Sequence, residues 1–266
     1  MNLVSFKHTV WKFYRAHGRG HLPWRQTREP YKILVSEIML QQTQVERVIP
    51  KYKSFLKKFP TARALAKATN KDVLLEWQGL GYNRRALALK RAAEAVVSDF
   101  GGKFPQTLEE LLTLPGVGRA TAGDLLAFAF NKPAIVIETN IRTVFIHHFL
   151  RDKKNIPDKQ ILELIEKTLD KKRPREWYYA LMDYGAHLKK TLGNNATRSK
   201  HYKKQSTFKG SNRELRSHIL KLILAKPQKK TDLLKLLNKP AVAIHANLLA
   251  LEREGLIHRT RNTFSA

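Results

Sequence analysis

The sequence predicts an all-α protein that ends in a small unit of mixed structure. Apolar residues recur every three to four positions over most of the 266 residues, which is the spacing of one helix face. Few stretches alternate apolar and polar residues with a period of two, as half-buried strands do. Apolar residues make up 42% of the chain, so a sizeable core is expected.

The N-terminal part of the chain is expected to begin with an amphipathic helix. Five apolar or aromatic residues fall on one face of it: Leu3, Phe6, Val10, Phe13 and Tyr14. The loop HLPWRQTREP then interrupts the pattern and ends at Pro30, a residue suited to the first turn of a helix. Further helices are expected to begin near Tyr31, Thr43, Asn70 and Tyr82.

The middle of the chain continues the helical pattern. Thr107 and Glu110 have the spacing of a capping box before Leu111 and Leu112. Longer helical patterns follow over 120–130, 139–150, 158–169 and 177–188.

Residues 189–212 are polar, strongly basic and poor in aliphatic side chains. They form either a linker whose cations follow a phosphate backbone or a solvated connector. Residues 213–266 then form a compact second unit: three helical stretches, the last ending at Gly255, and a short strand pair in LIHRTRNTFSA. This is the order of a winged helix, a unit that binds either DNA or another protein.

Composition limits the classes of partner and cofactor. Lys and Arg number 50 against 22 for Asp and Glu, a net charge of +28, which favours a nucleic acid as partner. The chain has no cysteine, so disulfides, zinc fingers and a cysteine-held iron–sulfur cluster are excluded. The N-terminus lacks the features of a secretory signal, and no apolar run approaches the ~20 residues that span a bilayer. We expect an intracellular protein with no membrane partner, cytoplasmic and nucleoid-associated if its source is prokaryotic.

The motif LPGVGRATAGDLLAFAF begins at Leu114 and predicts a tight hairpin between two helices. Gly116 and Gly118 carry no side chain, so peptide N–H groups can approach a phosphate there, and the next helix adds the positive end of its dipole. Such a hairpin grips DNA without reading its sequence. An ordinary αα-hairpin has similar local features.

Two glutamates are candidates for acid–base chemistry. Glu37 lies in the apolar stretch ILVSEIML, where burial would raise its pKa toward that of a neutral-pH general acid. A place on the solvent face is the alternative for an isolated helical glutamate. Glu138 follows a β-branched run and opens a helix, where it either faces an electropositive pocket or only complements the helix dipole. Asp124 is expected to make local contacts, and Asp183 is expected to be structural.

Four collinear motifs resemble the helix-hairpin-helix (HhH-GPD) DNA glycosylase superfamily and, within it, the A/G-specific adenine glycosylase (MutY-like) branch. They are LPWR at 22–25, PYKILVSEIMLQQTQV at 30–45, GLGYNRRALAL at 79–89 and LPGVGRATAG at 114–123. The resemblance implies a two-lobed helical fold that flips a mispaired adenine, opposite G or 8-oxoguanine, out of double-stranded DNA and hydrolyses its N-glycosidic bond.

The resemblance also implies residue roles. Glu37 corresponds to the acid that protonates adenine at N7, and Glu138 occupies the position of the catalytic aspartate. Gln42 and Tyr82 correspond to residues that wedge into the duplex. The remaining DNA contacts are expected from Arg25, Gly116, Val117, Gly118, Arg119 and Thr121. A Na⁺ or K⁺ ion on backbone carbonyls of 114–118 is implied as well, with no other metal and no organic cofactor.

The chemistry needs two carboxyl groups in different protonation states. One acid protonates the leaving base, and one carboxylate stabilises the positive charge that develops on the sugar. Bifunctional relatives carry a lysine at the position of Ala120, so a monofunctional enzyme without lyase activity is expected. The resemblance further suggests a monomer.

Three departures from the family keep alternatives open. Glu138 is one methylene longer than aspartate, and a misplacement of about 1 Å is costly for a catalytic group. The cluster cysteines are missing, and cations such as Arg198 and Lys200 stand in their region. The C-terminal domain that reads 8-oxoguanine is not recognisable. A thymine or uracil mismatch glycosylase on the same fold, and a DNA-binding protein that has lost catalysis, are the alternatives.

The expected domains follow from the resemblance. Residues 1–188 would form the glycosylase core, with an inner lobe over 30–150 and an outer lobe from 1–29 and 151–188. Residues 189–212 would be a basic linker in place of the iron–sulfur loop, and 213–266 a winged-helix-like domain.

Overall fold

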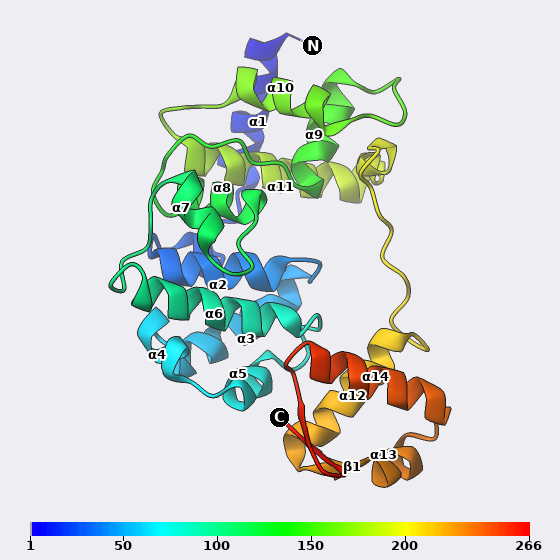
Figure 1. The fold of residues 1–266 in the computed structure, drawn as a ribbon. Coiled ribbons are helices and arrows are strands. Elements are labelled where there is room, and N and C mark those ends of the chain that lie inside the picture. Colours follow the sequence, from blue (N-terminus) through cyan, green and yellow to red (C-terminus); the bar gives the residue numbers. More distant parts are fainter. Residues whose placement is uncertain (1) are drawn as a thin grey trace. The chain divides into compact units, whose positions relative to one another are not determined.

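A computed structural model describes residues 2–266 and is mostly helical (Figure 1). The first half of the chain contains six α-helices and one 3₁₀ helix: α1 Leu3–His17, η1 Pro23–Arg25, α2 Pro30–Leu40, α3 Val45–Lys58, α4 Ala62–Lys67, α5 Asn70–Trp77 and α6 Arg84–Ser98. The middle adds α7 Leu108–Thr113, α8 Arg119–Phe128, α9 Thr139–Phe149, α10 Asp158–Thr168, α11 Pro174–Leu192 and η2 Asn195–Arg198.

The C-terminal part combines three helices with a small sheet. Its elements are α12 Asn212–Ala225, β1 Gln228–Lys229, α13 Lys230–Leu237, α14 Ala241–Arg253, β2 His258–Thr260 and β3 Thr263–Ser265. The strands lie antiparallel in the order β1-β3-β2, with Gln228 and Arg259 both opposite Phe264. The three helices and the final strand pair agree with the sequence-based expectation. β1 has two residues, too few to show any period. The assignment as a winged helix stays a prediction.

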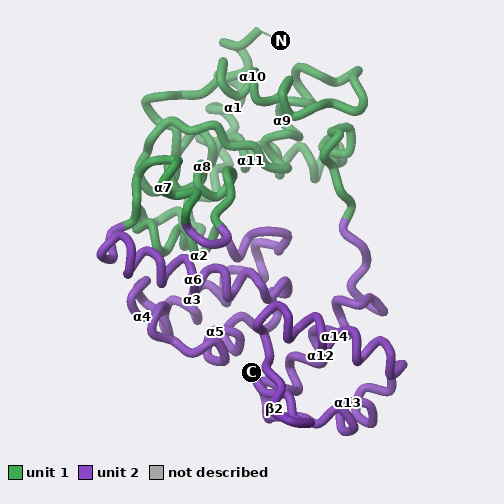
Figure 2. The backbone as a smooth tube through the Cα atoms, viewed as in Figure 1, with its two compact units in different colours: residues 1–37, 104–113, 117–204 green, residues 38–103, 114–116, 205–266 purple. Residues whose placement is uncertain are grey.

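The chain divides into two compact units (Figure 2). Unit 1 comprises residues 1–37, 104–113 and 117–204, and unit 2 comprises 38–103, 114–116 and 205–266. This division does not follow the lobes expected from the sequence, and those domain boundaries stay predictions. Among the described residues, no helix is both long enough and apolar enough to cross a membrane.

Unit 1 is built around α11, which packs against α1, α8 and α9. The core there is aromatic: the ring of Phe6 lies 5.2 Å from that of Phe145 and 6.2 Å from that of Trp177. Tyr178 is fully buried on α11, and its hydroxyl accepts a hydrogen bond from the Val136 N–H and donates one to the carbonyl of Ala134. These bonds fix the irregular segment before α9, which carries Glu138.

Unit 2 contains two apolar clusters. The first lies among α3, α4, α5 and α6 and is centred on the buried rings of Phe55 and Trp77, which are 6.0 Å apart. The second lies among α12, α13, α14 and the sheet and includes Ile219, Leu233 and Leu248. α12 also contacts α5.

Most expected helices are present. α2, α3, α5 and α6 begin within two residues of their predicted starts. Thr107 and Glu110 pair before α7 as their spacing predicted: the Thr107 hydroxyl accepts the Glu110 N–H at 3.3 Å and donates to the Glu110 carboxylate at 2.7 Å. The short helix α4, Ala62–Lys67, was not predicted.

Candidate active site

Three carboxyl groups in unit 1 interact with one another: Glu37 on α2, Glu138 at the start of α9 and Asp124 on α8. Each is largely enclosed by protein but retains some solvent-accessible surface. The predicted pair of glutamates is therefore brought together. Asp124, which was expected to make only local contacts, joins them.

Glu37 is the last residue of α2 that belongs to unit 1. It directly follows the buried residues Leu34, Val35 and Ser36. Burial raises its pKa to about 8, the charge of Glu138 adds to the increase, and the charge of Arg25 opposes it. A carboxyl group with this pKa is protonated at neutral pH and can act as a general acid.

Glu138 is the N-cap residue of α9. Its Oε1 accepts the Ile141 N–H at 2.9 Å, and its Oε2 accepts the side-chain amide of Asn140 at 3.3 Å. Burial raises the pKa of Glu138, but the N–H groups at the helix start and the charges of Arg142 and Lys189 oppose that increase. These donors stabilise the ionised form, which suits a group that faces positive charge.

Asp124 differs from the two glutamates in its surroundings. Its Oδ1 is buried and has no hydrogen-bond partner among residues 2–266. Burial and the charges of Glu37 and Glu138 hold its pKa well above the usual value. The position of this aspartate within the apolar stretch TAGDLLAF is a sequence signal for a buried acid. The sequence could not show which groups surround it, because they come from distant segments.

Two glycines allow the helices to approach closely around these groups. A Cβ on Gly185 of α11 would lie 2.6 Å from the carbonyl carbon of Asn140, against the first turn of α9. A Cβ on Gly123 of α8 would lie 3.1 Å from Val136 and 3.3 Å from the Ile135 carbonyl oxygen. The absence of side chains at these positions therefore brings Glu138 and Asp124 into the same site.

Arg25 is committed to an ion pair. Its guanidinium donates to both carboxylate oxygens of Asp183, at 2.7 and 2.8 Å, and its side chain is 4% exposed. The Arg25 guanidinium also stacks on the ring of Tyr179 at 4.3 Å, and Arg19 completes the coordination of Asp183 through its backbone N–H and Nε. Arg25 thus acts on Glu37 through its charge, and its guanidinium is engaged by Asp183 and Tyr179. Its predicted contact with DNA stays a prediction.

The predicted hairpin lies between α7 and α8. Gly116 has a φ of +79°, and a Cβ there would lie 2.6 Å from the Cβ of Ala88, so a larger residue is excluded on two grounds. Gly118 is the N-cap residue of α8, is exposed and has no atoms within 4 Å of an added Cβ among the described residues. Arg119 is exposed, whereas Val117 and Thr121 are buried.

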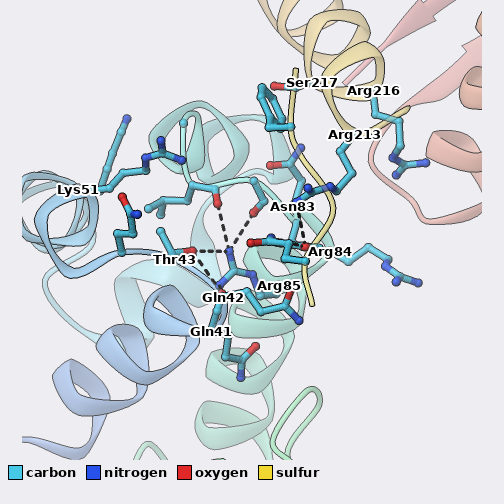
Figure 3. Close-up of a pocket in the computed structure, with 18 of the residues that line it drawn as sticks. Gln41, Gln42, Thr43, Lys51, Asn83, Arg84, Arg85, Arg213, Arg216 and Ser217 are labelled. Atoms are coloured by element: carbon cyan, nitrogen blue, oxygen red, sulfur yellow. Dashed lines mark hydrogen bonds between the residues drawn. The ribbon is translucent and has the colours of Figure 1, made fainter. Parts of the chain in front are cut away.

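The two predicted wedge residues, Gln42 and Tyr82, line a pocket of about 1040 Å³ in unit 2. Figure 3 shows this pocket, with Gln42 labelled. Both wedge residues have left-handed backbone conformations, with φ of 55° and 48°, which are uncommon outside glycine. The hydroxyl of Tyr82 accepts hydrogen bonds from Gln205 at 2.7 Å and Arg213 at 3.1 Å. The lining is strongly basic, and its charged residues are Arg47, Lys51, Arg84, Arg85, Arg213, Arg216 and Glu254.

Arg85 fixes the two loops that carry the wedge residues. Its guanidinium donates to the carbonyls of Ile38 and Met39 at the end of α2 and of Gln41 just after it, and to those of Leu80 and Gly81 on the loop before α6. Figure 3 shows Arg85 among the pocket residues on which it acts. Burial lowers the pKa of Arg85 to about 10, so the group stays charged at neutral pH. The strained conformations are therefore held by a buried cation.

The predicted basic linker is anchored to unit 1 at its start. The backbone of Ile156 pairs with Ser199, donating to the Arg198 carbonyl and accepting the Lys200 N–H, and Ala196 is buried. Arg198 is partly exposed and Lys200 is exposed. Their predicted phosphate contacts stay predictions.

Metal ligands do not gather into a site. No group of three or more His, Cys, Asp or Glu residues suited to a metal ion occurs in the described part of the chain. Because the sequence has no cysteine, it has no ligands for a cysteine-held iron–sulfur cluster.

Comparison with known proteins gives consistent matches. The family model for the HhH-GPD superfamily of base excision DNA repair proteins matches residues 35–171. An adenine DNA glycosylase from Buchnera aphidicola subsp. Baizongia pistaciae is 38% identical over 190 residues, covering 70% of this chain and 53% of the relative. The adenine DNA glycosylase of Homo sapiens is 35% identical over 196 residues, covering 69% and 36%. The chain thus spans about half or less of these relatives.

Solved structures agree on the fold. A thermostable thymine-DNA glycosylase matches with a TM-score of 0.61 and 29% identity, covering 69% of this chain and 86% of that one. A non-covalent endonuclease III–DNA complex matches with a TM-score of 0.56 and 21% identity, covering 78% and 91%, which is a likeness of fold alone.

Proposed function

The chain belongs to the HhH-GPD superfamily of base excision DNA repair proteins, and from that premise we propose that it is a monofunctional DNA glycosylase that removes a mispaired adenine from double-stranded DNA. The observation that carries this proposal is the meeting of Glu37 and Glu138 in one site. One is protonated at neutral pH and the other has donors for its ionised form, which is the pairing that glycosidic bond cleavage needs.

The proposed reaction begins with the flipped-out nucleotide in unit 1. As the bond between the sugar C1′ and adenine N9 breaks, its electron pair moves into the base, and Glu37 donates its proton to N7. Protonation makes the base a better leaving group, because no full negative charge develops on it. Glu37 is left as a carboxylate beside Arg25, whose charge opposes the increase in its pKa.

Glu138 would then stabilise the sugar cation. Its carboxylate supplies a negative charge near C1′, where a water molecule adds and loses its proton to a carboxylate. The hydrogen bonds from Ile141 and Asn140 hold this longer side chain in one orientation. That fixed geometry supports the proposal that a glutamate takes the place of the family's aspartate.

DNA binding is proposed at two places that are basic or rich in free N–H groups. The exposed Gly118 and Arg119 begin α8, where the helix dipole favours a phosphate, and a Na⁺ or K⁺ ion on carbonyls of 114–118 would join it there. In unit 2, the basic pocket with Gln42 and Tyr82 would contact the duplex around the vacated position. Monomeric action and an absence of lyase activity belong to the same proposal.

A second candidate function is excision of thymine from G·T pairs. The solved thymine-DNA glycosylase, 29% identical with a TM-score of 0.61, specifically favours it. The greater identity of the adenine DNA glycosylases, 38% for the Buchnera protein, supports adenine as the first choice.

The test is a base-release assay under single-turnover conditions on matched duplexes that differ only in one pair: A·G, A·8-oxoguanine, T·G, U·G and A·T. The proposal expects free adenine and an abasic strand from the first two. Release of thymine or uracil alone would favour the second candidate. Tight binding with no release from any duplex would leave only a DNA-binding role.

A further inference from the structure

The unpartnered Oδ1 of Asp124 indicates a ligand contact that the two-carboxyl mechanism does not use. A buried polar atom without a hydrogen-bond partner costs free energy, and native proteins keep such atoms mainly where a ligand or ordered water completes them. Within residues 2–266 nothing completes Oδ1, although it interacts electrostatically with Glu37 and Glu138. Its missing partner is therefore expected to enter the site from outside.

The fold directs Asp124 into this site from a third helix. Asp124 lies one turn after Ala120 on α8, so the two share a helix face, and Ala120 is exposed while Asp124 is largely enclosed. The next residue back, Gly123, allows α8 to lie against Ile135 and Val136, just before Glu138. The α8 face thus runs from solvent inward to the carboxyl groups.

We propose that Asp124 binds the excised base, pairing its carboxyl group with the amino group of adenine and the ring nitrogen beside it. The inference rests on the proposed function and specifies how that site recognises its base. Glu37 is assigned to N7, so Asp124 takes the Watson–Crick edge, on which flipped bases are read.

The protonation state of Asp124 suits this pairing. The groups that face it are Glu37 from α2, Glu138 from the start of α9 and Tyr178 from α11, and none carries a positive charge. Burial and the two neighbouring glutamates raise the pKa of Asp124 and so favour its neutral form. A neutral carboxyl group has one O–H donor and one carbonyl acceptor side by side, which matches an acceptor nitrogen beside an amino donor. Asn and Gln recognise adenine with the same pair of groups.

This chemistry separates Asp124 from a catalytic carboxylate. An asparagine keeps one donor and one acceptor in the same shape, so Asp124→Asn should preserve base recognition. A leucine keeps roughly the shape and removes both polar groups, so Asp124→Leu should lose it. If Asp124 worked as an ionised group, Asp124→Asn would be the damaging change.

The experiment compares adenine with unsubstituted purine, which lacks the amino group, placed opposite G in otherwise identical duplexes. Single-turnover release is measured for the wild-type protein, Asp124→Asn, Asp124→Leu and the exposed control Asp152→Asn. Because purine and adenine leave at different intrinsic rates, the adenine-to-purine ratio is compared among variants. We expect the ratio to fall at least about tenfold in Asp124→Leu, as for one lost buried hydrogen-bonding pair, and to stay near wild type in the other two.

A binding arm makes the result independent of cleavage. Affinities are measured for duplexes whose adenosine or purine nucleoside carries a 2′-fluorine that blocks bond breakage, and thermal unfolding identifies variants that fail to fold. If Asp124→Leu does not fold, the wild-type preference is followed as the pH rises, where ionised Asp124 should lose it and Asp124→Asn should keep it. An unchanged preference in folded Asp124→Leu, or its loss in Asp124→Asn, would overturn the inference. Wild-type protein that prefers adenine in binding but releases no base would refute the proposed activity alone.

Discussion

Replacing Glu37 by glutamine should stabilise the folded protein while removing its proposed acid. Glutamine resembles the protonated carboxyl group in size and charge, so the two proteins should be equally stable below the ordinary carboxyl pKa. As the pH rises from about 4.5, unfolded wild-type chains release the Glu37 proton, whereas folded chains retain it until about pH 8. Wild-type stability therefore falls over that window, and the stability of Glu37→Gln does not.

The size of the effect follows from the pKa. Each pH unit between the unfolded and folded pKa values lowers the stability of wild type by about 1.4 kcal/mol, so the whole window lowers it by at most about 5 kcal/mol. Because Glu37 keeps some solvent-accessible surface, we expect a stability gain of roughly 1–3 kcal/mol at pH 8.

Urea denaturation of wild type and Glu37→Gln at pH 4.5, 6, 7 and 8 measures this gain directly. Glu163→Gln, an exposed position in the middle of α10, is the matched control and should show little difference at any of these values. A Glu37→Gln protein that is less stable than wild type, or a difference that does not grow with pH, would refute the assignment of Glu37 as a buried, protonated acid.

Three further substitutions test how the site is held. Gly185→Ala should lower the free energy of unfolding by at least about 2 kcal/mol and slow base release about a hundredfold, because the added Cβ would displace the first turn of α9. The control Gly20→Ala, which has open space around it, should change neither the release rate nor the urea midpoint. Arg85→Lys should lower the free energy of unfolding by about 2–3 kcal/mol, because an ammonium cannot reach five carbonyls that lie at the end of α2 and on the loops after α2 and before α6. An unchanged urea midpoint would contradict this. Asp183→Asn should lower the free energy of unfolding by about 3–5 kcal/mol near pH 7, and by progressively less as the pH falls below the ordinary aspartate pKa of 3.8. Burial alone would raise the pKa of Asp183, but Arg25 and Arg19 hold it below the usual value. Its contribution to stability is therefore lost as the pH falls below the usual pKa and through the lowered pKa of the folded protein, which acid titration of stability would detect.

The fold was largely predictable because its helices carry their own signals. Apolar periodicity located α1, α8 and α9, and the Thr107–Glu110 capping box marked the start of α7. α4 was missed because six residues span fewer than two turns and show little periodicity. β1 was missed because its two residues pair only with a strand that follows much later in the chain.

The site was only partly predictable because charge interactions depend on long-range packing. The apolar stretch around Glu37 made a buried acid one of two interpretations, with the solvent face as the other, and the resemblance favoured the first. In the structure, burial and the charge of Glu138 raise the pKa of Glu37. The sequence did not indicate that Asp124 would face the same site, since that depends on the close approach of Gly123 to Val136. The sequence also did not indicate that Arg25 would form an ion pair with Asp183, which lies 158 positions further along the chain.

The most direct measurement is the single-turnover rate of adenine release from an A·G duplex by wild type, Glu37→Gln and Glu138→Gln, with duplex affinity measured in parallel. The account predicts that wild type releases adenine and that both variants bind the duplex like wild type but release base at least about a hundredfold more slowly. Adenine release at the wild-type rate by Glu37→Gln would contradict it.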